Sequence, residues 1–127
     1  MPREKIITAI DVGSSKVSTI IAALTDEKIS VIGVSGAVPS KGIKKGNVVD
    51  IDEAVKSISH SLERAERMAG VSVSSAFVTI NGSHLKTLNS HGVVAVSHQG
   101  AEITPEDVAR VTEAAQAVTL PSSREII

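Results

Sequence analysis

Five residues near the start of the chain have the types and spacing of a phosphate-binding turn: Asp11, Gly13, Ser14, Ser15 and Lys16. Glycine has no Cβ, so the backbone N–H groups beside it can approach an anion closely. The serine hydroxyls can donate hydrogen bonds to phosphate oxygens, lysine supplies a positive charge, and a carboxylate can hold a metal ion through water. The five residues therefore predict a site for a phosphate chain and its metal ion.

The segments on both sides of this turn, residues 6–10 and 17–21, are rich in β-branched residues, which predicts two strands joined by a hairpin turn. A Walker-type phosphate loop needs the pattern G-x-x-x-x-G-K-[ST] followed by a helix, and neither is present. The turn instead resembles the first phosphate motif of the actin, Hsp70 and sugar-kinase superfamily. Asp, Gly and Ser also favour ordinary turns, so the motif alone leaves both interpretations open.

Composition limits the classes of function. The chain has 127 residues, which is enough for one domain or slightly more. It contains one Phe and no Trp or Tyr, and its net charge is −1, so it is not expected to bind nucleic acid. It has no cysteine, which excludes disulfides and thiolate metal sites. No apolar run approaches the length that a membrane span requires.

The pattern along the chain predicts a third strand over residues 29–38, a helix from Asp50 to Gly70 and a fourth strand over residues 71–80. Asp50 suits the N-cap, and Gly70 suits the left-handed residue that follows a helix. Apolar residues three and four positions apart predict the buried stripe of the helix: Ile51, Val55, Ile58, Leu62, Ala65 and Ala69. This order of elements predicts an α/β (α+β) fold, a mixed sheet with a packed helix.

Residues 39–49 are expected to form a loop that carries three cations, Lys41, Lys44 and Lys45. These lysines fit a solvated loop better than a contact surface for an acidic partner.

The last third of the chain has a different pattern. Residues 85–96 predict one long bent strand or two short ones, with Gly92 as a bulge. A second helix is expected to begin with Thr104 as its cap and Pro105 at its first position. An apolar strand begins at residues 124–127, and because it has only begun there, we expect the chain to be part of a longer one.

Several blocks of sequence, in order, resemble the N-terminal portion of the FtsA family of bacterial actin-like cell-division proteins. The blocks are residues 9–17 (AIDVGSSKV), 39–51 (PSKGIKKGNVVDI), 63–71 (ERAERMAGV), 80–84 (INGSH), 89–94 (NSHGVV), 102–108 (EITPEDV) and 124–127 (REII). Most actin-like relatives lack the second block. The resemblance covers essentially the whole chain and is far more specific than the turn alone.

The resemblance implies an actin-like (ribonuclease H-like) fold. Residues 1–82 would form the first actin-like subdomain with the phosphate turn, and residues 83–127 the beginning of the inserted subdomain that is peculiar to this family. Asp11 would organise Mg²⁺ through water. The residues that would contact the β- and γ-phosphates of ATP are Gly13, Ser14, Ser15 and Lys16.

The resemblance also implies a function: an ATP-binding protein that polymerises and helps to anchor the FtsZ ring to the membrane. Its partners would be FtsZ, other divisome proteins and further copies of itself. It would act in the cytoplasm, at the inner face of the cell membrane at the division septum, and reach the membrane through a C-terminal segment absent from this sequence. No catalytic residue is assigned, so we expect at most weak ATPase activity, and none from this part of the protein alone.

Two other functions use the same kind of turn. A PilM-like scaffold for type IV pilus assembly shares the fold, but residues 42–50 argue against it. An actin-fold kinase of small metabolites would need a catalytic carboxylate and a substrate pocket, and this sequence supplies neither.

Overall fold

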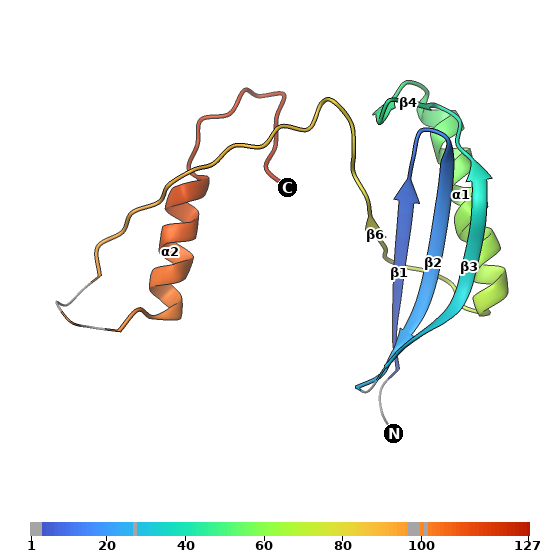
Figure 1. Cartoon of the computed structure of the whole chain (residues 1–127), viewed down its shortest axis with the longest axis horizontal. Helices are drawn as coiled ribbons and strands as arrows, with labels where there is room; N and C mark the ends of the chain where they lie inside the picture. The colour runs from blue at the N-terminus through green and yellow to red at the C-terminus, as the bar shows by residue number, and fades with distance from the viewer. Residues whose placement is uncertain (1–3, 27, 97–99, 101) are drawn as a thin grey trace. The chain divides into compact units, whose positions relative to one another are not determined.

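The computed structural model of the chain describes residues 4–26, 28–96, 100 and 102–127. They form two compact units, one extending to Lys86 and the other from Thr87 to Ile127. Figure 1 shows a sheet with a helix in the first unit and a helix with extended segments in the second. Within the described residues, every strand belongs to the first unit.

The first unit is built on a four-stranded sheet in the order β3–β2–β1–β6. Three of its strands form an antiparallel meander, β1 (Lys5–Val12), β2 (Lys16–Leu24) and β3 (Ile29–Pro39). The short strand β6 (Phe77–Val78) pairs with β1 in parallel. The sheet is therefore mixed, as predicted.

Helix α1 (Ile51–Ala69) packs on one face of this sheet, mainly against β2 and β3 (Figure 1). The Asp50 carboxylate caps it by accepting a hydrogen bond from the Glu53 N–H at 3.1 Å. Gly70 ends it in the left-handed conformation, with φ of 69°. Both predicted ends of the helix and the predicted packing of a helix on a mixed sheet are confirmed.

The buried face of α1 differs from the predicted apolar stripe. Ile51 is 72% exposed and Val55 is 54% exposed, whereas the residues that face the sheet are small. The buried set is Ala54, Ser57, Ser61 and Ala65. The reason is the close approach of helix and sheet, because a Cβ added to Gly33 would lie 2.5 Å from the Ala65 carbonyl oxygen. Large side chains do not fit at that separation.

Hydroxyl groups occupy part of this narrow layer. The Thr19 and Ser61 hydroxyl oxygens are 2.8 Å apart, and the Ser61 hydroxyl donates to that of Ser35 at 3.1 Å. All three side chains are buried. Buried hydroxyls are tolerated here because each has a hydrogen-bond partner.

The predicted loop over residues 39–49 contains a small hairpin. Strands β4 (Ile43–Lys44) and β5 (Asn47–Val48) pair antiparallel, and Lys45 and Gly46 form the turn between them. Both turn residues have positive φ, 49° and 78°, as a type I′ turn requires. The lysines of this region therefore lie on and beside a hairpin rather than in an irregular loop.

The fourth strand is much shorter than predicted. Only Phe77–Val78, of the predicted residues 71–80, pairs with β1. The segment before it is held by the helix instead, because the Glu66 carboxylate accepts a hydrogen bond from the Val73 N–H at 2.7 Å.

The second unit contains helix α2 (Pro105–Gln116), which begins as predicted. The Thr104 hydroxyl accepts from the Asp107 N–H, and the Asp107 carboxylate accepts from the Thr104 N–H, which completes a capping box.

The strands predicted in this part of the chain are wrong. Residues 85–96 and 124–127 are described and contain no strand. A strand is defined by pairing with a neighbour, and neither segment pairs with another in the described part of the chain. Gly92 is not a bulge. A Cβ there would collide with the Val111 carbonyl, so this glycine lets the extended segment lie against α2.

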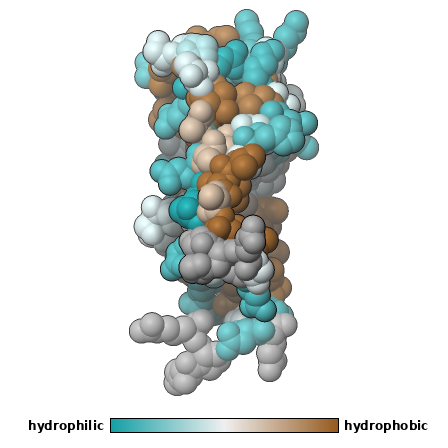
Figure 2. All heavy atoms as spheres, turned by 90° about the vertical axis from the view of Figure 1, so that its left-hand side faces the viewer, coloured by the Kyte–Doolittle hydropathy of each residue, from teal (hydrophilic) through white to brown (hydrophobic). Residues whose placement is uncertain are grey.

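Apolar side chains reach the surface in several places, and Figure 2 shows hydrophobic atoms in brown among hydrophilic atoms in teal on the face that it presents. The large apolar residues of the second unit that are at least half exposed are Leu88, Val93, Ile103, Val108, Ile126 and Ile127. None of the helices in the described residues has both the length and the hydropathy of a membrane span.

Candidate functional site

The predicted phosphate turn connects β1 and β2 at one end of the sheet (Figure 1). The Gly13 N–H donates to the Lys16 carbonyl at 3.0 Å. A Cβ on Gly13 would lie 2.8 Å from that oxygen, so a side chain is incompatible with this tight closure. Ser14 and Ser15 are exposed at the tip, and in the described structure their N–H groups have no hydrogen-bond acceptor. The turn therefore offers N–H groups to an anion.

Asp11, at the end of β1, is exposed and held by a residue that the sequence analysis missed. The Thr79 hydroxyl donates to the Asp11 carboxylate at 2.7 Å and accepts from the Val12 N–H at 3.2 Å. The Thr79 N–H donates to the Ile10 carbonyl at 3.0 Å. Thr79 thus continues the contact of β6 with β1 and fixes the orientation of the carboxylate.

Two other segments are bonded to the tip of the turn. The Gly46 N–H of the β4–β5 hairpin donates to the Ser14 hydroxyl oxygen at 2.9 Å. The Ser40 N–H donates to the Ser15 carbonyl at 3.0 Å. The backbone of Gly46 also packs against Gly82, because a Cβ on Gly46 would lie 2.5 Å from the Gly82 Cα. Residues 40–46 are therefore bonded to the phosphate turn, and Gly82 packs against the far side of this segment's Gly46.

A hollow of about 420 Å³ lies beside this meeting point. Its apolar wall includes Val12, Ile43, Val48 and Ile58, and its polar groups include Thr79, Asn81 and His84. The sequence analysis assigned no role to these polar residues. Their signal in the sequence was the Asn81-Gly82 turn, which is separated from the end of β6 by two residues and places Gly82 against Gly46 of the hairpin.

All five predicted site residues lie in this one turn and its flanking strand ends, and their chemistry suits an anion. The described residues contain no cluster of three or more His, Cys, Asp or Glu side chains able to hold a metal ion. Magnesium does not need such a cluster, because it binds one or two carboxylates together with substrate phosphates and keeps several waters. Asp11 therefore fits a metal ion that arrives with phosphate groups.

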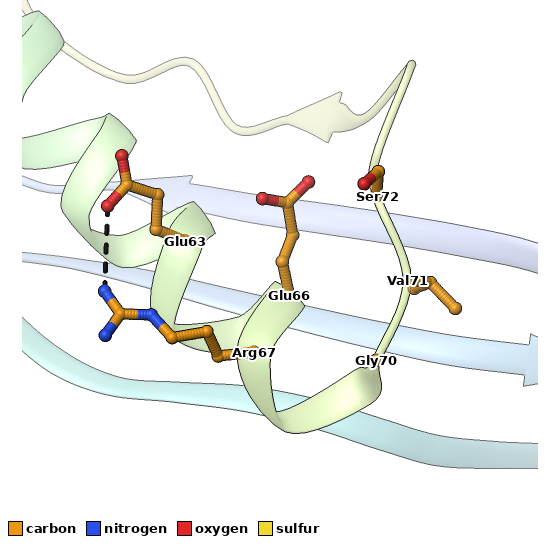
Figure 3. A pocket seen from close by; sticks show the side chains of 6 residues that line it. All are labelled: Glu63, Glu66, Arg67, Gly70, Val71 and Ser72. Carbon is orange, nitrogen blue, oxygen red and sulfur yellow. Dashed lines mark ion pairs between the residues drawn. The ribbon is translucent and has the colours of Figure 1, made fainter.

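A second hollow, of about 430 Å³, lies at the C-terminal end of α1 and is unrelated to this site (Figure 3). Its carboxylates are already engaged. Glu63 forms an ion pair with Arg67 at 3.7 Å, and Glu66 accepts the Val73 N–H. We assign it no chemistry, because its charged groups neutralise one another or hold the backbone.

Comparison with known proteins identifies relatives of the chain. It is 43% identical to the cell division protein FtsA of Bacillus subtilis over 127 residues, which are the whole of this chain and 29% of that protein. The chain is a homologue of FtsA. It is also 43% identical to FtsA of Pseudomonas aeruginosa and 32% identical to FtsA of Escherichia coli, in each case over 97% of this chain and 29% of the relative. The chain thus spans less than a third of the length of these relatives.

A family model described as the SHS2 domain inserted in FtsA matches residues 82–127. The match begins at Gly82, the residue that packs against Gly46 beside the phosphate turn. Together with the mixed sheet and its helix, this match confirms the predicted fold class, including an FtsA-specific insert in the second part of the chain.

Proposed function

We propose that the intact protein is an ATP-binding, actin-like cell-division protein that polymerises and helps to anchor the FtsZ ring to the membrane. Two observations support this proposal. The chain is homologous to proteins named cell division protein FtsA, and its phosphate turn combines N–H groups open to a ligand with a carboxylate fixed by Thr79.

In this proposal each predicted residue has a role at the turn. Gly13 permits the tight closure, and the N–H and hydroxyl groups of Ser14 and Ser15 bind the β- and γ-phosphates of ATP. The Lys16 ammonium balances their charge. Asp11 holds the hydration shell of Mg²⁺, and the ion when bound neutralises the phosphate chain. Only ATP binding is proposed for these residues, with ATPase activity at most weak.

We also propose that the two parts of the chain belong to two subdomains with different roles. Residues 1–82 form the first actin-like subdomain, and residues 83–127 begin the inserted subdomain, which takes part in self-association and in contacts with divisome proteins. The intact protein would act in the cytoplasm, at the inner face of the membrane at the division septum. Its membrane contact would use a C-terminal segment outside this sequence.

Titration of the intact protein with MgATP tests the site. We expect Asp11→Ala to weaken binding at least tenfold, which corresponds to about 1.4 kcal/mol. Asp26→Ala is the matched control, because Asp26 is also exposed but lies in the connection between β2 and β3. Equal affinities of wild type and Asp11→Ala would show that the carboxylate does not serve the nucleotide.

Co-sedimentation with FtsZ filaments tests the cellular role. We expect the intact protein to pellet with FtsZ filaments and to remain in the supernatant without them, under conditions where it does not polymerise alone. Absence of association would instead favour the pilus-assembly alternative, and phosphoryl transfer to a sugar or small acid would favour the kinase alternative.

A further inference from the structure

The tip of the β4–β5 hairpin is strained and carries an unusual residue. Lys45 has φ of 49°, and within the described residues it is the only non-glycine residue with positive φ. Type I′ turns favour Asn, Asp or Gly at this position, because other side chains adopt the left-handed conformation at a cost. A strained residue that is kept in place by its surroundings is a reason to look for a function.

The surroundings hold this turn against the phosphate turn. Gly46, the next residue, donates its N–H to the Ser14 hydroxyl oxygen at 2.9 Å and packs against Gly82 on its other side. Lys45 therefore directly precedes the residue that is hydrogen-bonded to the Ser14 hydroxyl, a group to which the proposed function assigns phosphate binding. The four-carbon stem of lysine is long enough to span that offset.

The charge of Lys45 is available to a ligand. Its side chain is exposed, and none of the ion pairs within the described residues includes it. A compact ammonium on a flexible stem is well suited to bind phosphate as a point charge.

We infer that Lys45, on the β4–β5 hairpin, is a second cationic contact for the phosphate chain of the nucleotide, in addition to Lys16. This inference rests on the proposed function, because it adds a residue to the same site. The hairpin then forms a wall of the phosphate site, and the hydrogen bond between Gly46 and Ser14 sets the position of that wall. The contact strengthens binding through charge, so it depends on the number of phosphates and on ionic strength.

The test is titration of the intact protein with MgATP, MgADP and adenosine, using Lys45→Asn. Asparagine removes the charge but suits the type I′ turn, so the hairpin is retained or stabilised. We expect a loss of MgATP affinity of about tenfold, a smaller loss for MgADP and no change for adenosine. Lys45→Arg retains a charge and should stay within about threefold of wild type.

Lys44→Gln is the matched control, because it removes the same charge from the adjoining residue of β4, which is also exposed. We expect it to bind MgATP within twofold of wild type. Equal affinities of Lys45→Asn and Lys44→Gln would overturn the inference and leave the phosphate turn in place, provided that Asp11→Ala still weakens binding. Absence of MgATP binding by the wild-type protein would overturn both the inference and the proposed function.

Discussion

The two units of the chain differ in what stabilises them. In the first unit, side chains of the sheet and of α1 bury one another, and Val17, Ile21 and Ala65 have no exposed surface. In the second unit, the one buried residue among those described is a carboxylate, that of Asp107. The first unit therefore depends on close packing, and the second depends on hydrogen bonds around the start of one helix.

These hydrogen bonds form a small network. The N–H and hydroxyl of Thr104 donate to one oxygen of the Asp107 carboxylate at 3.0 and 2.9 Å, and Arg110 donates to the other. Arg110 also donates to the Ala95 carbonyl at 3.1 Å, which ties the extended segment to α2. Because the network centres on one ionised carboxylate, the stability of the second unit should depend on pH. The stability of the first unit should depend instead on the volume of the side chains between the sheet and α1.

The largest effect is expected where the sheet and α1 approach most closely. Gly33→Val places atoms 2.5 Å from the Ala65 carbonyl oxygen and 2.7 Å from the Ala69 Cβ, so the helix must move. We expect the free energy of unfolding of the first unit to fall by about 3 kcal/mol. Hydrogen exchange of the β2 and β3 amides in the intact protein measures this change.

The matched control is Gly36→Val on the same strand, because a Cβ at Gly36 meets nothing within 4 Å. Valine favours strands, so its effect should lie within about 0.5 kcal/mol of zero or be stabilising. If both variants lowered protection equally, close contact with α1 would not be what holds the first unit together.

A smaller effect is expected from the buried hydroxyl layer. Ser61→Ala removes the hydrogen-bond partner of the buried Thr19 hydroxyl, whereas the Ser35 hydroxyl still donates to the Gly36 carbonyl at 3.1 Å. A buried hydroxyl without a partner is costly. We expect a loss of about 1–2 kcal/mol in the same exchange measurement. Ser59→Ala, at an exposed position of the same helix, should change the value by less than about 0.5 kcal/mol. A loss no larger than that of the control would mean that water replaces the missing hydroxyl.

Features governed by neighbours in sequence could be predicted. The hairpin around Gly13, the capping of α1 by Asp50 and the capping of α2 by Thr104 all depend on residues a few positions apart. The five residues of the candidate site could be proposed from the sequence for the same reason, because they form one continuous turn and its flanking strand ends.

Features that depend on distant segments could not be predicted. The small-residue face of α1 follows from the position of Gly33 in another element, and an apolar periodicity does not reveal that separation. The bond from Thr79 to Asp11 follows from the parallel pairing of β6 with β1. The docking of Gly46 on Ser14 similarly requires the hairpin to fold back on the turn.

Residues 85–96 were mistaken for a strand because β-branched composition favours pairing but does not supply a partner.

The smallest expected effect is a loss of stability in acid that is confined to the second unit. The hydrogen bond from the Thr104 N–H, together with those from Arg110 and the Thr104 hydroxyl, holds the pKa of the Asp107 carboxyl below its ordinary value. A carboxyl whose pKa is lowered in the folded state stabilises that state above its ordinary pKa of about 4, and the contribution is lost as the pH falls through the lowered value. We therefore expect the amides of α2 to lose protection below about pH 4, whereas those of β2 are unchanged by this group.

Asp107→Asn identifies the group responsible. Asparagine keeps the shape and one acceptor oxygen but does not ionise, so α2 should be less protected at neutral pH and should no longer respond to this titration. The NMR chemical shifts of the Asp107 carboxyl and of the α2 amides, recorded in one pH series, follow both events. If wild type and Asp107→Asn showed the same acid transition in α2, the transition would belong to other carboxylates. The hydrogen bonds to Asp107 would then not be what stabilises the second unit against acid.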